Sequence, residues 1–298
     1  MKKIISRFSL VFFVWILFLI FLDGCVQFRS STPEFEKYFQ SQRVSAKIAT
    51  YQVLDREIRY VATGDTNTEA TILFIHGAPS STSYFKTYLT DSILLSKACL
   101  LAVDRPGYGY SGFGKPEKSI EKQVKMILPI LNSSNKIKRP VILVGTSYGT
   151  SIACRMAMDN PDLIDGLVLV APALAPGEEK IYPISYPFDL PPLRWMVPRM
   201  LLSANAEKLS HRAELTKMLP LWKNIKAPVI YLQGEKDELV YTTNADFARK
   251  KMVNVPSLEI IMIADKGHLI AFSEKETIMR AIYRMLDLSK KNHLVSHR

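Results

Sequence analysis

Short apolar runs alternate with amphipathic stretches along most of the chain. Six runs have the length and composition of buried strands: residues 71–75, 100–103, 141–144, 167–170, 229–232 and 259–263. Before them, residues 44–53 and 57–62 flank a polar turn and suggest an opening hairpin. Helical periodicity falls between the runs, near residues 84–95, 119–131, 148–158, 242–252 and 274–287. This alternation predicts an α/β fold, with a doubly wound and mostly parallel eight-stranded sheet whose sites lie at the carboxyl ends of its strands.

Prolines interrupt this alternation of strands and helices at two places. Pro129 should kink or end the second helix. Eight of the 17 prolines lie between Pro172 and Pro220, together with several aromatic and methionine residues. A long connection inside a compact domain is usually functional. We therefore expect a lid at about residues 172–226, above the carboxyl ends of the strands, with part of it contacting substrate; the alternative is that its apolar residues only pack it onto the body.

The first 25 residues have the composition of an export signal. Basic residues precede an apolar run from Phe8 to Leu22, which is shorter than the roughly 20 residues that span a bilayer. The segment ends in L-D-G-C, which resembles a bacterial lipoprotein box with Cys25 as the lipid attachment site, although Asp23 departs from the pattern. The alternatives are an uncleaved N-terminal anchor and an unlipidated secreted protein. A lipoprotein or an anchor would place the protein at a membrane in the cell envelope.

The remaining boundaries follow from composition. Residues 26–43 are polar with scattered aromatics and are predicted to form a tether. Residues 44–290 form the predicted domain, and residues 291–298 a polar tail.

Charge and cysteine content narrow the class of protein. The 298 residues carry a formal charge of +11, which favours either nucleic acid or an anionic membrane as a partner. The basic residues show no recognised nucleic-acid-binding pattern, so a lipid surface is the better hypothesis. Three cysteines exclude a disulfide scaffold and a multi-cysteine zinc site. Cys99 and Cys154 lie in apolar runs and are expected to be buried thiols, though export leaves a bridge between them open.

The sequence Gly145-Thr146-Ser147-Tyr148-Gly149 is the strongest chemical signal. It follows a predicted strand and precedes a predicted helix, which is the context of a nucleophile elbow. Ser147 would sit in the sharp turn with its hydroxyl exposed. The backbone N–H of Tyr148, at the start of the helix, could then stabilise an oxyanion.

A second motif supports this interpretation. The sequence H-G-A-P at residues 76–79 ends an earlier strand, and Ala78 is the expected second oxyanion donor. With these motifs the chain resembles the α/β-hydrolase family, in its H-G-x-P form, from about residue 45 to residue 288. The sequence D-R-P-G-Y-G-Y-S at residues 104–111 matches the loop that follows the next strand in that family. The resemblance implies that this loop is structural, and His76 is also expected to be structural.

A serine nucleophile needs a base and a carboxylate that orients the base. The family's chain order is Ser, acid, His, and His268 follows the last predicted strand in the family's G-H context. His211 lies in the insertion, and His293 and His297 lie in the polar tail. The loop Q-G-E-K-D-E-L-V after the strand 229–232 resembles the family's G-x-x-D-x-x-V and selects Asp237; Glu235 and Glu238 are its local rivals.

A serine nucleophile favours acyl transfer. We expect a serine esterase or lipase that works through an acyl-enzyme, with no metal and no organic cofactor. Its partners would be a small-molecule ester and a membrane surface. One alternative is a proline-iminopeptidase-like aminopeptidase, for which Glu178, Glu179 or Asp189 could hold a substrate amine. Others are a lysophospholipase or monoacylglycerol lipase, and a hydrolase-like binding protein without turnover. The sequence leaves the natural substrate and the oligomeric state open.

Overall fold

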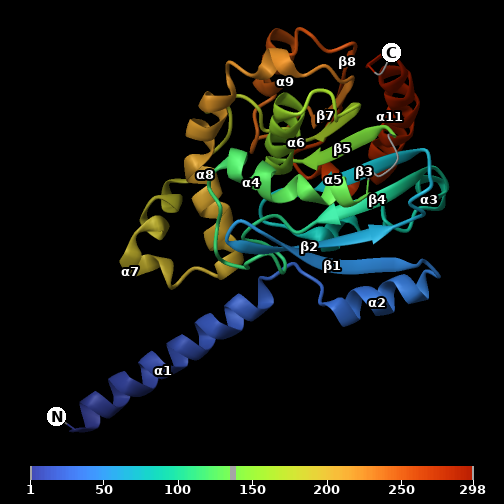
Figure 1. Cartoon of the computed structure of the whole chain (residues 1–298). Helices are drawn as coiled ribbons and strands as arrows, with labels where there is room; N and C mark the ends of the chain where they lie inside the picture. The colour runs from blue at the N-terminus through green and yellow to red at the C-terminus, as the bar shows by residue number, and fades with distance from the viewer. Residues whose placement is uncertain (1, 135–138, 297–298) are drawn as a thin grey trace.

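The computed structural model describes residues 2–134 and 139–296 and is built around one eight-stranded sheet (Figure 1). The strand order is β1-β2-β4-β3-β5-β6-β7-β8. β1 and β2 pair antiparallel, as do β2 and β4, and the other neighbours are parallel. The bounds are β1 Ala46–Val53, β2 Arg56–Thr63, β3 Ala70–Ile75, β4 Ala98–Val103, β5 Val141–Thr146, β6 Gly166–Val170, β7 Val229–Gly234 and β8 Leu258–Ile263. The predicted mostly parallel sheet and its opening hairpin are confirmed.

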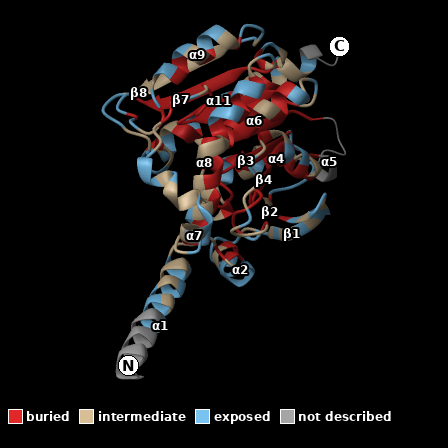
Figure 2. Cartoon of the chain, turned by 90° about the vertical axis from the view of Figure 1, so that its left-hand side faces the viewer, coloured by how far each residue is buried: buried red, intermediate tan, exposed pale blue. Residues whose placement is uncertain are grey.

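The central strands are apolar on both faces because helices cover both. In β3, Leu73 and Ile75 pack into the core cluster on one side, and Ile72 and Phe74 into the cluster on the other. This is the alternation that a strand imposes on successive side chains. Figure 2 shows these buried strands running between layers of helices.

The helices divide between the two faces. One core cluster includes residues of α4 (Ile120–Ile127), α6 (Tyr148–Asp159), α8 (Arg199–Met218) and α9 (Thr243–Lys251). The other includes residues of α2 (Thr32–Ser41), α3 (Ser92–Lys97), α10 (Ile270–Ser273) and α11 (Lys275–Ser296). A further short helix, α5 (Pro129–Ser134), begins at Pro129, so the predicted interruption of the helix there is confirmed.

The prediction of one helix near residues 84–95 is wrong. A 3₁₀ turn at Thr82–Phe85 is followed by irregular chain, and α3 begins only at Ser92. The Asp91 side chain accepts hydrogen bonds from the backbone N–H groups of Ile93 and Leu94. Asp91 therefore caps a new helix, which separates the two segments.

The prediction that residues 26–43 form a tether is also wrong, because much of this range is helical. Residues Thr32–Ser41 form α2, which starts with a capping box between Ser31 and Glu34. Phe35 and Phe39 lie one helical turn apart, with 0% and 2% of their surfaces exposed. Their burial in the core cluster docks this helix on the domain, so the scattered aromatics are the apolar face of a helix.

The chain is helical past the end predicted for the domain. α11 continues to Ser296, whereas residues 291–298 were expected to be a polar tail. His293 Nδ1 lies 3.0 Å from Asp165 Oδ1, which holds this last part of α11 against the body. His297 lies outside the described residues.

The N-terminal segment is helical and projects from the body. α1 spans Lys2–Cys25, and Figure 1 shows it extending away from the domain. The described side chains begin at Phe13, so the basic start of the predicted signal lies outside them. Within the described part of the chain, no helix is both long enough and apolar enough to cross a membrane. Cys25 is exposed, and Cys99 and Cys154 are buried free thiols.

The insertion between β6 and β7 is more regular than its proline content suggested. Two 3₁₀ turns, Pro183–Ser185 and Pro187–Asp189, lead to the short helix α7 (Pro191–Arg194). The 20-residue helix α8 then returns to the body, and a 3₁₀ turn at Trp222–Asn224 precedes β7. We call residues 172–226 the insertion.

Candidate active site

Ser147 lies in a strained turn between β5 and α6. Its φ of +48° and ψ of −122° fall outside the regions that residues with a side chain ordinarily adopt. The flanking glycines allow this turn to pack closely. A Cβ on Gly149 would lie 2.3 Å from the Ile75 carbonyl oxygen, and one on Gly145 would lie 2.8 Å from the Gly149 carbonyl oxygen. The spacing of glycines around Ser147 therefore follows from the contact of α6 with β3 and β5.

Hydrogen bonds connect Ser147 to the predicted base and acid. Ser147 Oγ lies 3.0 Å from His268 Nε2, and His268 Nδ1 lies 2.8 Å from Asp237 Oδ2. Asp237 is buried in the loop after β7, where its Oδ1 accepts the backbone N–H groups of Leu239 and Val240. The structure thus brings together three residues that lie 31 and 121 positions apart.

The two predicted oxyanion donors lie beside Ser147. Ala78 and Tyr148 line the same cavity as the Ser147 side chain. A Cβ on Gly77 would lie 3.0 Å from the Ser147 Cβ, so the loop before Ala78 passes close to Ser147. Tyr148 is the first residue of α6, and the positive end of the helix dipole therefore faces this region.

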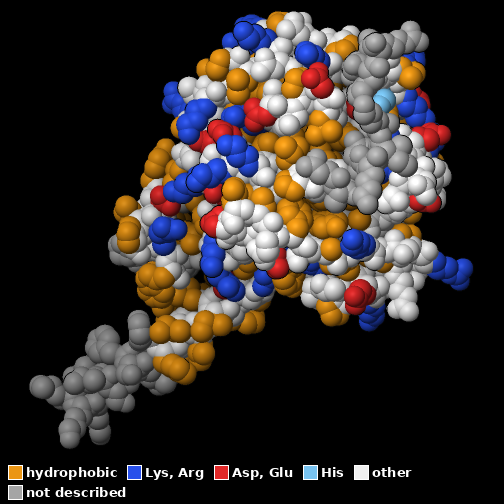
Figure 3. Space-filling model, viewed as in Figure 1, with side chains coloured by type: hydrophobic (Ala, Val, Ile, Leu, Met, Phe, Trp, Pro, Cys, Tyr) orange, Lys and Arg blue, Asp and Glu red, His pale blue; other side chains and the backbone are white. Residues whose placement is uncertain are grey.

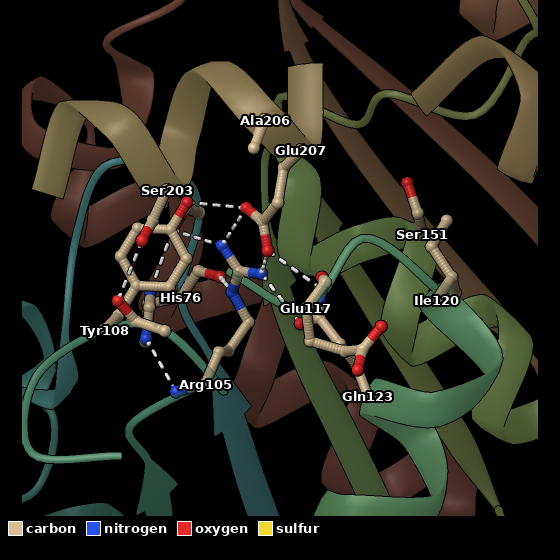
Figure 4. A network of polar contacts seen from close by, with 12 residues as sticks. His76, Arg105, Tyr108, Glu117, Ile120, Gln123, Ser151, Ser203, Ala206 and Glu207 are labelled. Carbon is tan, nitrogen blue, oxygen red and sulfur yellow. Dashed lines mark hydrogen bonds and ion pairs between the residues drawn. The ribbon is translucent and has the colours of Figure 1, made fainter. Parts of the chain in front are cut away.

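A buried ion pair fastens the insertion to the body behind this loop (Figure 4). Arg105 and Glu207 of α8 form a bidentate pair at 2.7 and 3.0 Å. Glu207 also accepts hydrogen bonds from the Tyr108 hydroxyl at 2.6 Å and from the Gln123 amide at 2.8 Å. Both members of the pair are fully buried, so removing one would leave an uncompensated charge in the core.

The same arginine supports the loop that carries Ala78. The Arg105 side chain donates to the carbonyl oxygens of His76 and Gly77 at 2.8 and 3.0 Å. His76 Nε2 accepts the backbone N–H of Arg105, and Nδ1 lies 2.7 Å from the Gly77 carbonyl oxygen. Burial, and then the charge of Arg105, hold the pKa of His76 well below its usual value. His76 is therefore a neutral structural residue, as predicted.

Asp104 is structural as well. It is fully buried and accepts hydrogen bonds from the backbone N–H and the hydroxyl of Thr82 and from the backbone N–H of Tyr110. These contacts connect the loop after β4 to the 3₁₀ turn at Thr82–Phe85. Asp104 is not among the residues that line the cavity.

A second serine and histidine lie one helical turn behind Ser147. Ser151 Oγ donates to the Ala173 carbonyl oxygen at 2.6 Å and lies 2.9 Å from His211 Nε2. His211 Nδ1 lies 2.8 Å from Glu179 Oε1. Ser151 and His211 are both fully buried, and neither is among the residues that line the cavity beside Ser147.

Glu179 connects this cluster to the cavity. Its second oxygen, Oε2, lies 2.6 Å from the ammonium group of Lys208. Burial alone would raise the pKa of Glu179, but His211 and then Lys208, by charge and hydrogen bonding, lower that pKa to about 2. Glu179 is therefore ionised at neutral pH, with both oxygens engaged.

The cavity around Ser147 has two lobes. The larger, of about 390 Å³, lies under the insertion and has charged and polar residues among those that line it: Glu179, Lys180, Ser185, Asn205 and Lys208. The smaller, of about 200 Å³, is mainly apolar and is lined by residues that include Tyr84, Leu239, Leu269 and Phe272. Ser147 and His268 line both lobes, so a bound molecule could reach to either side of Ser147.

Sequence reasoning missed the residues that anchor α8. No sequence motif includes Glu207, and the sequence places His211 only within the insertion. Their partners lie 102 and 60 positions away, so nothing local identified them. One signal in the sequence could have found them. Glu207 and His211 lie four positions apart in α8, a helix that also packs on the core.

Residues 72–281 match the sequence profile described as the alpha/beta hydrolase family. The chain belongs to this family. It is 32% identical over 124 residues to monoacylglycerol lipase abhd6-A of Xenopus laevis, a match that covers 41% of this chain and 36% of the lipase. The match therefore spans only about a third of that relative's length.

Solved structures show the same fold in proteins with different activities. A membrane phospholipase A has a TM-score of 0.63 and 17% identity, with 97% of this chain and 99% of that chain covered. The haloalkane dehalogenase DatA of Agrobacterium tumefaciens has a TM-score of 0.64 and 21% identity, with 82% and 97% covered. The shared fold therefore does not decide which bond this hydrolase cleaves.

Proposed function

We propose that the protein is a serine hydrolase that cleaves carboxylic esters through an acyl-enzyme. The observation that carries this proposal is the chain of hydrogen bonds from Ser147 through His268 to Asp237, opening into a cavity beside Ala78 and Tyr148. A nucleophile, a base and an orienting carboxylate in this order are the groups that acyl transfer requires. The identity to a monoacylglycerol lipase supports ester cleavage as the reaction class.

Each group has a defined part in the proposed reaction. The Ser147 hydroxyl attacks the ester carbonyl carbon and gives its proton to His268 Nε2. Asp237 stabilises the resulting imidazolium, and the backbone N–H groups of Ala78 and Tyr148 stabilise the oxyanion. His268 then protonates the leaving alcohol, and the same residue activates the water that releases the acid. Loss of one oxyanion donor would raise the barrier by about 3 kcal/mol.

The acidic residues of the insertion disfavour the aminopeptidase alternative. Glu179 is the one carboxylate among the described residues lining the larger lobe, and His211 and Lys208 occupy both of its oxygens. Glu178 and Asp189 are absent from the described lining of both lobes. A substrate amine would therefore have to displace Lys208 or His211.

Labelling with a fluorophosphonate tests the nucleophile. We expect the wild type to be labelled and Ser147→Ala to remain unlabelled. Ser151→Ala is the matched control, because Ser151 also contacts a histidine but is fully buried. An unlabelled wild type, or equal labelling of Ser147→Ala, would refute the proposal.

A substrate panel tests the bond that is cleaved. We expect hydrolysis of p-nitrophenyl esters and little hydrolysis of aminoacyl-anilides. Faster turnover of the anilides would favour the aminopeptidase alternative. A preference for monoacylglycerol or lysophospholipid over p-nitrophenyl esters would assign one of the two lipid alternatives.

We further propose that the enzyme works at a membrane surface in the cell envelope. Apolar side chains are exposed on α1 and on the insertion: Phe13, Val14, Trp15, Leu17, Phe18, Ile20 and Phe21, and Tyr182, Ile184, Tyr186, Leu190 and Trp195. Figure 3 shows hydrophobic side chains gathered where α1 reaches the body. Exposed apolar area of this extent, with a basic protein behind it, is typical of a lipid-binding surface.

Asp23 links α1 to the insertion. Its Oδ1 accepts the backbone N–H of Arg199, the first residue of α8, at 2.7 Å, and its Oδ2 lies 2.8 Å from the Arg199 guanidinium. Pro198 precedes α8 and supplies no side-chain cap, so Asp23 caps this helix from a distant part of the chain. The residue that departs from the lipoprotein pattern thus has a structural contact.

Two modes of attachment fit this arrangement. An uncleaved α1 would keep the Asp23 contacts, whereas processing before Cys25 would remove them and leave a lipid on Cys25. The mass of the N-terminal peptide, isolated from membranes, separates the two.

Vesicle co-sedimentation tests the membrane proposal. We expect the full chain to bind anionic vesicles more strongly than neutral ones, and the double variant Phe18→Ser, Phe21→Ser to bind less to both. Val253→Ser, which changes an exposed apolar residue away from α1, is the control. Equal binding by the double variant would contradict the proposal.

A further inference from the structure

The larger lobe carries two lysines in addition to its one acid. Lys180 and Lys208 line it together with Glu179 and Ser147. Glu179, whose Oε2 lies 2.6 Å from the Lys208 ammonium group, offsets one of the two positive charges. Among the described residues that line this lobe, the charge of the second ammonium group is therefore left in excess beside Ser147.

Lys180 is positioned by the loop that holds Asp237. Glu179 forms a β-bridge with Val240, and the backbone N–H of Lys180 donates to the Leu239 carbonyl oxygen at 2.9 Å. Leu239 and Val240 are the residues whose N–H groups bind Asp237. The location of Lys180 relative to the triad is therefore set by backbone contacts.

The Lys180 ammonium group remains available to a ligand. It lies 5.2 Å from the centre of the Tyr182 ring, and within the described residues no carboxylate forms an ion pair with it. Lys208 uses one of its three N–H donors on Glu179. Together the two ammonium groups retain several donors for a negatively charged group.

We propose that the larger lobe binds an anionic group of the substrate, a carboxylate or a phosphate, through Lys180 and Lys208. The substrate is thus an ester with an anionic part on one side of the carbonyl carbon and an apolar part in the smaller lobe. The inference rests on the proposed ester hydrolysis and adds the class of substrate. The anion belongs either to the acyl group or to the alcohol, and both would meet the same lysines.

Two matched substrate pairs distinguish these sources. p-Nitrophenyl butyrate and p-nitrophenyl hemisuccinate have four-carbon acyl groups and differ in a terminal carboxylate. Monobutyrin and butyrylglycerol 3-phosphate have the same acyl group and differ in the charge of the alcohol. We expect the wild type to have the higher kcat/KM for the anionic member of at least one pair, and that pair identifies the side that carries the charge.

Removing the Lys180 charge tests its role. Lys180→Met keeps the length of the side chain, and we expect it to lower kcat/KM for the preferred anionic substrate by about tenfold, the size expected for one partly screened charge pair. The neutral partner should lose less, so that the ratio of kcat/KM between the anionic and the neutral member falls, and its remaining hydrolysis reports that the variant is folded. Lys180→Glu should reverse the preference within the pair.

Lys226→Met is the matched control. Lys226 is exposed, pairs with Asp162 at 3.6 Å and is not among the residues lining either lobe. It should leave both members of each pair unchanged. The inference would be overturned if the wild type showed no preference for the anionic member, or if Lys180→Met lost equal activity on both members. Hydrolysis of the neutral esters would in either case still support the proposed ester hydrolase. Failure to hydrolyse any ester, with no label on Ser147, would instead refute the proposed function and the inference with it.

Discussion

Single residues could be predicted as site candidates where the prediction depends on nearby sequence. Ser147 stands between two glycines that close packing requires, and Asp237 and His268 each follow a strand that could be recognised from its apolar run. Glu207 and His211 could not be assigned in this way. Each depends on a partner in another element, and their positions in α8 say nothing about the charge or hydroxyl group that faces them.

The lowered pKa of Glu179 gives a prediction about stability. Its folded pKa is about 2, against an ordinary value of 4.5. Because the folded state favours the ionised carboxylate more than the unfolded state does, the ionised Glu179 stabilises the fold. This stabilisation is fully present above about pH 4.5 and is lost as the pH falls toward 2. The loss should be about 1.4 kcal/mol per pH unit within that window.

Urea unfolding of wild type and Glu179→Gln measures this contribution. The difference in unfolding free energy should be constant between pH 5.5 and pH 7 and should shrink below pH 4.5. Glu178→Gln, at the neighbouring position, is the control. A difference that stays constant down to pH 3 would show that the ionised Glu179 does not stabilise the fold.

Elements were predicted best where their pattern was long and regular. The strands of the sheet and the helices α6 and α9 lie close to the expected positions. α2 was missed because a ten-residue helix with two buried aromatics resembles a polar segment with isolated apolar residues. The predicted helix near residues 84–95 failed because Asp91, a helix cap, lies inside the window that suggested it.

Truncating Phe35 tests whether α2 is part of the domain. Phe35→Ala should lower the unfolding free energy by about 3 kcal/mol, because a fully buried aromatic side chain leaves a cavity. Phe28→Ala is the control, since that side chain is 58% exposed. Equal stability of the two variants in urea would mean that residues 32–41 do not pack on the core.

The candidate site lies at the carboxyl edge of the sheet, beneath the insertion. The parallel strands bring Ser147, Asp237 and His268 to one edge of the sheet, as the order of strands and helices predicted. The two lobes could not be predicted, because they depend on where α8 crosses that edge and on the Arg105–Glu207 pair that fixes it. The net charge of +11 suggested two kinds of partner, and two lysines of the larger lobe place part of that charge beside Ser147.

Trapping the acyl-enzyme tests the proposed reaction most directly. The full-length protein would be mixed with p-nitrophenyl butyrate, quenched with acid within the first turnover and digested for peptide mass mapping. We predict a burst of p-nitrophenol and one butyryl group on Ser147, with neither in Ser147→Ala. A butyryl group on another residue, or undiminished turnover by Ser147→Ala, would contradict the assignment of Ser147 as the nucleophile.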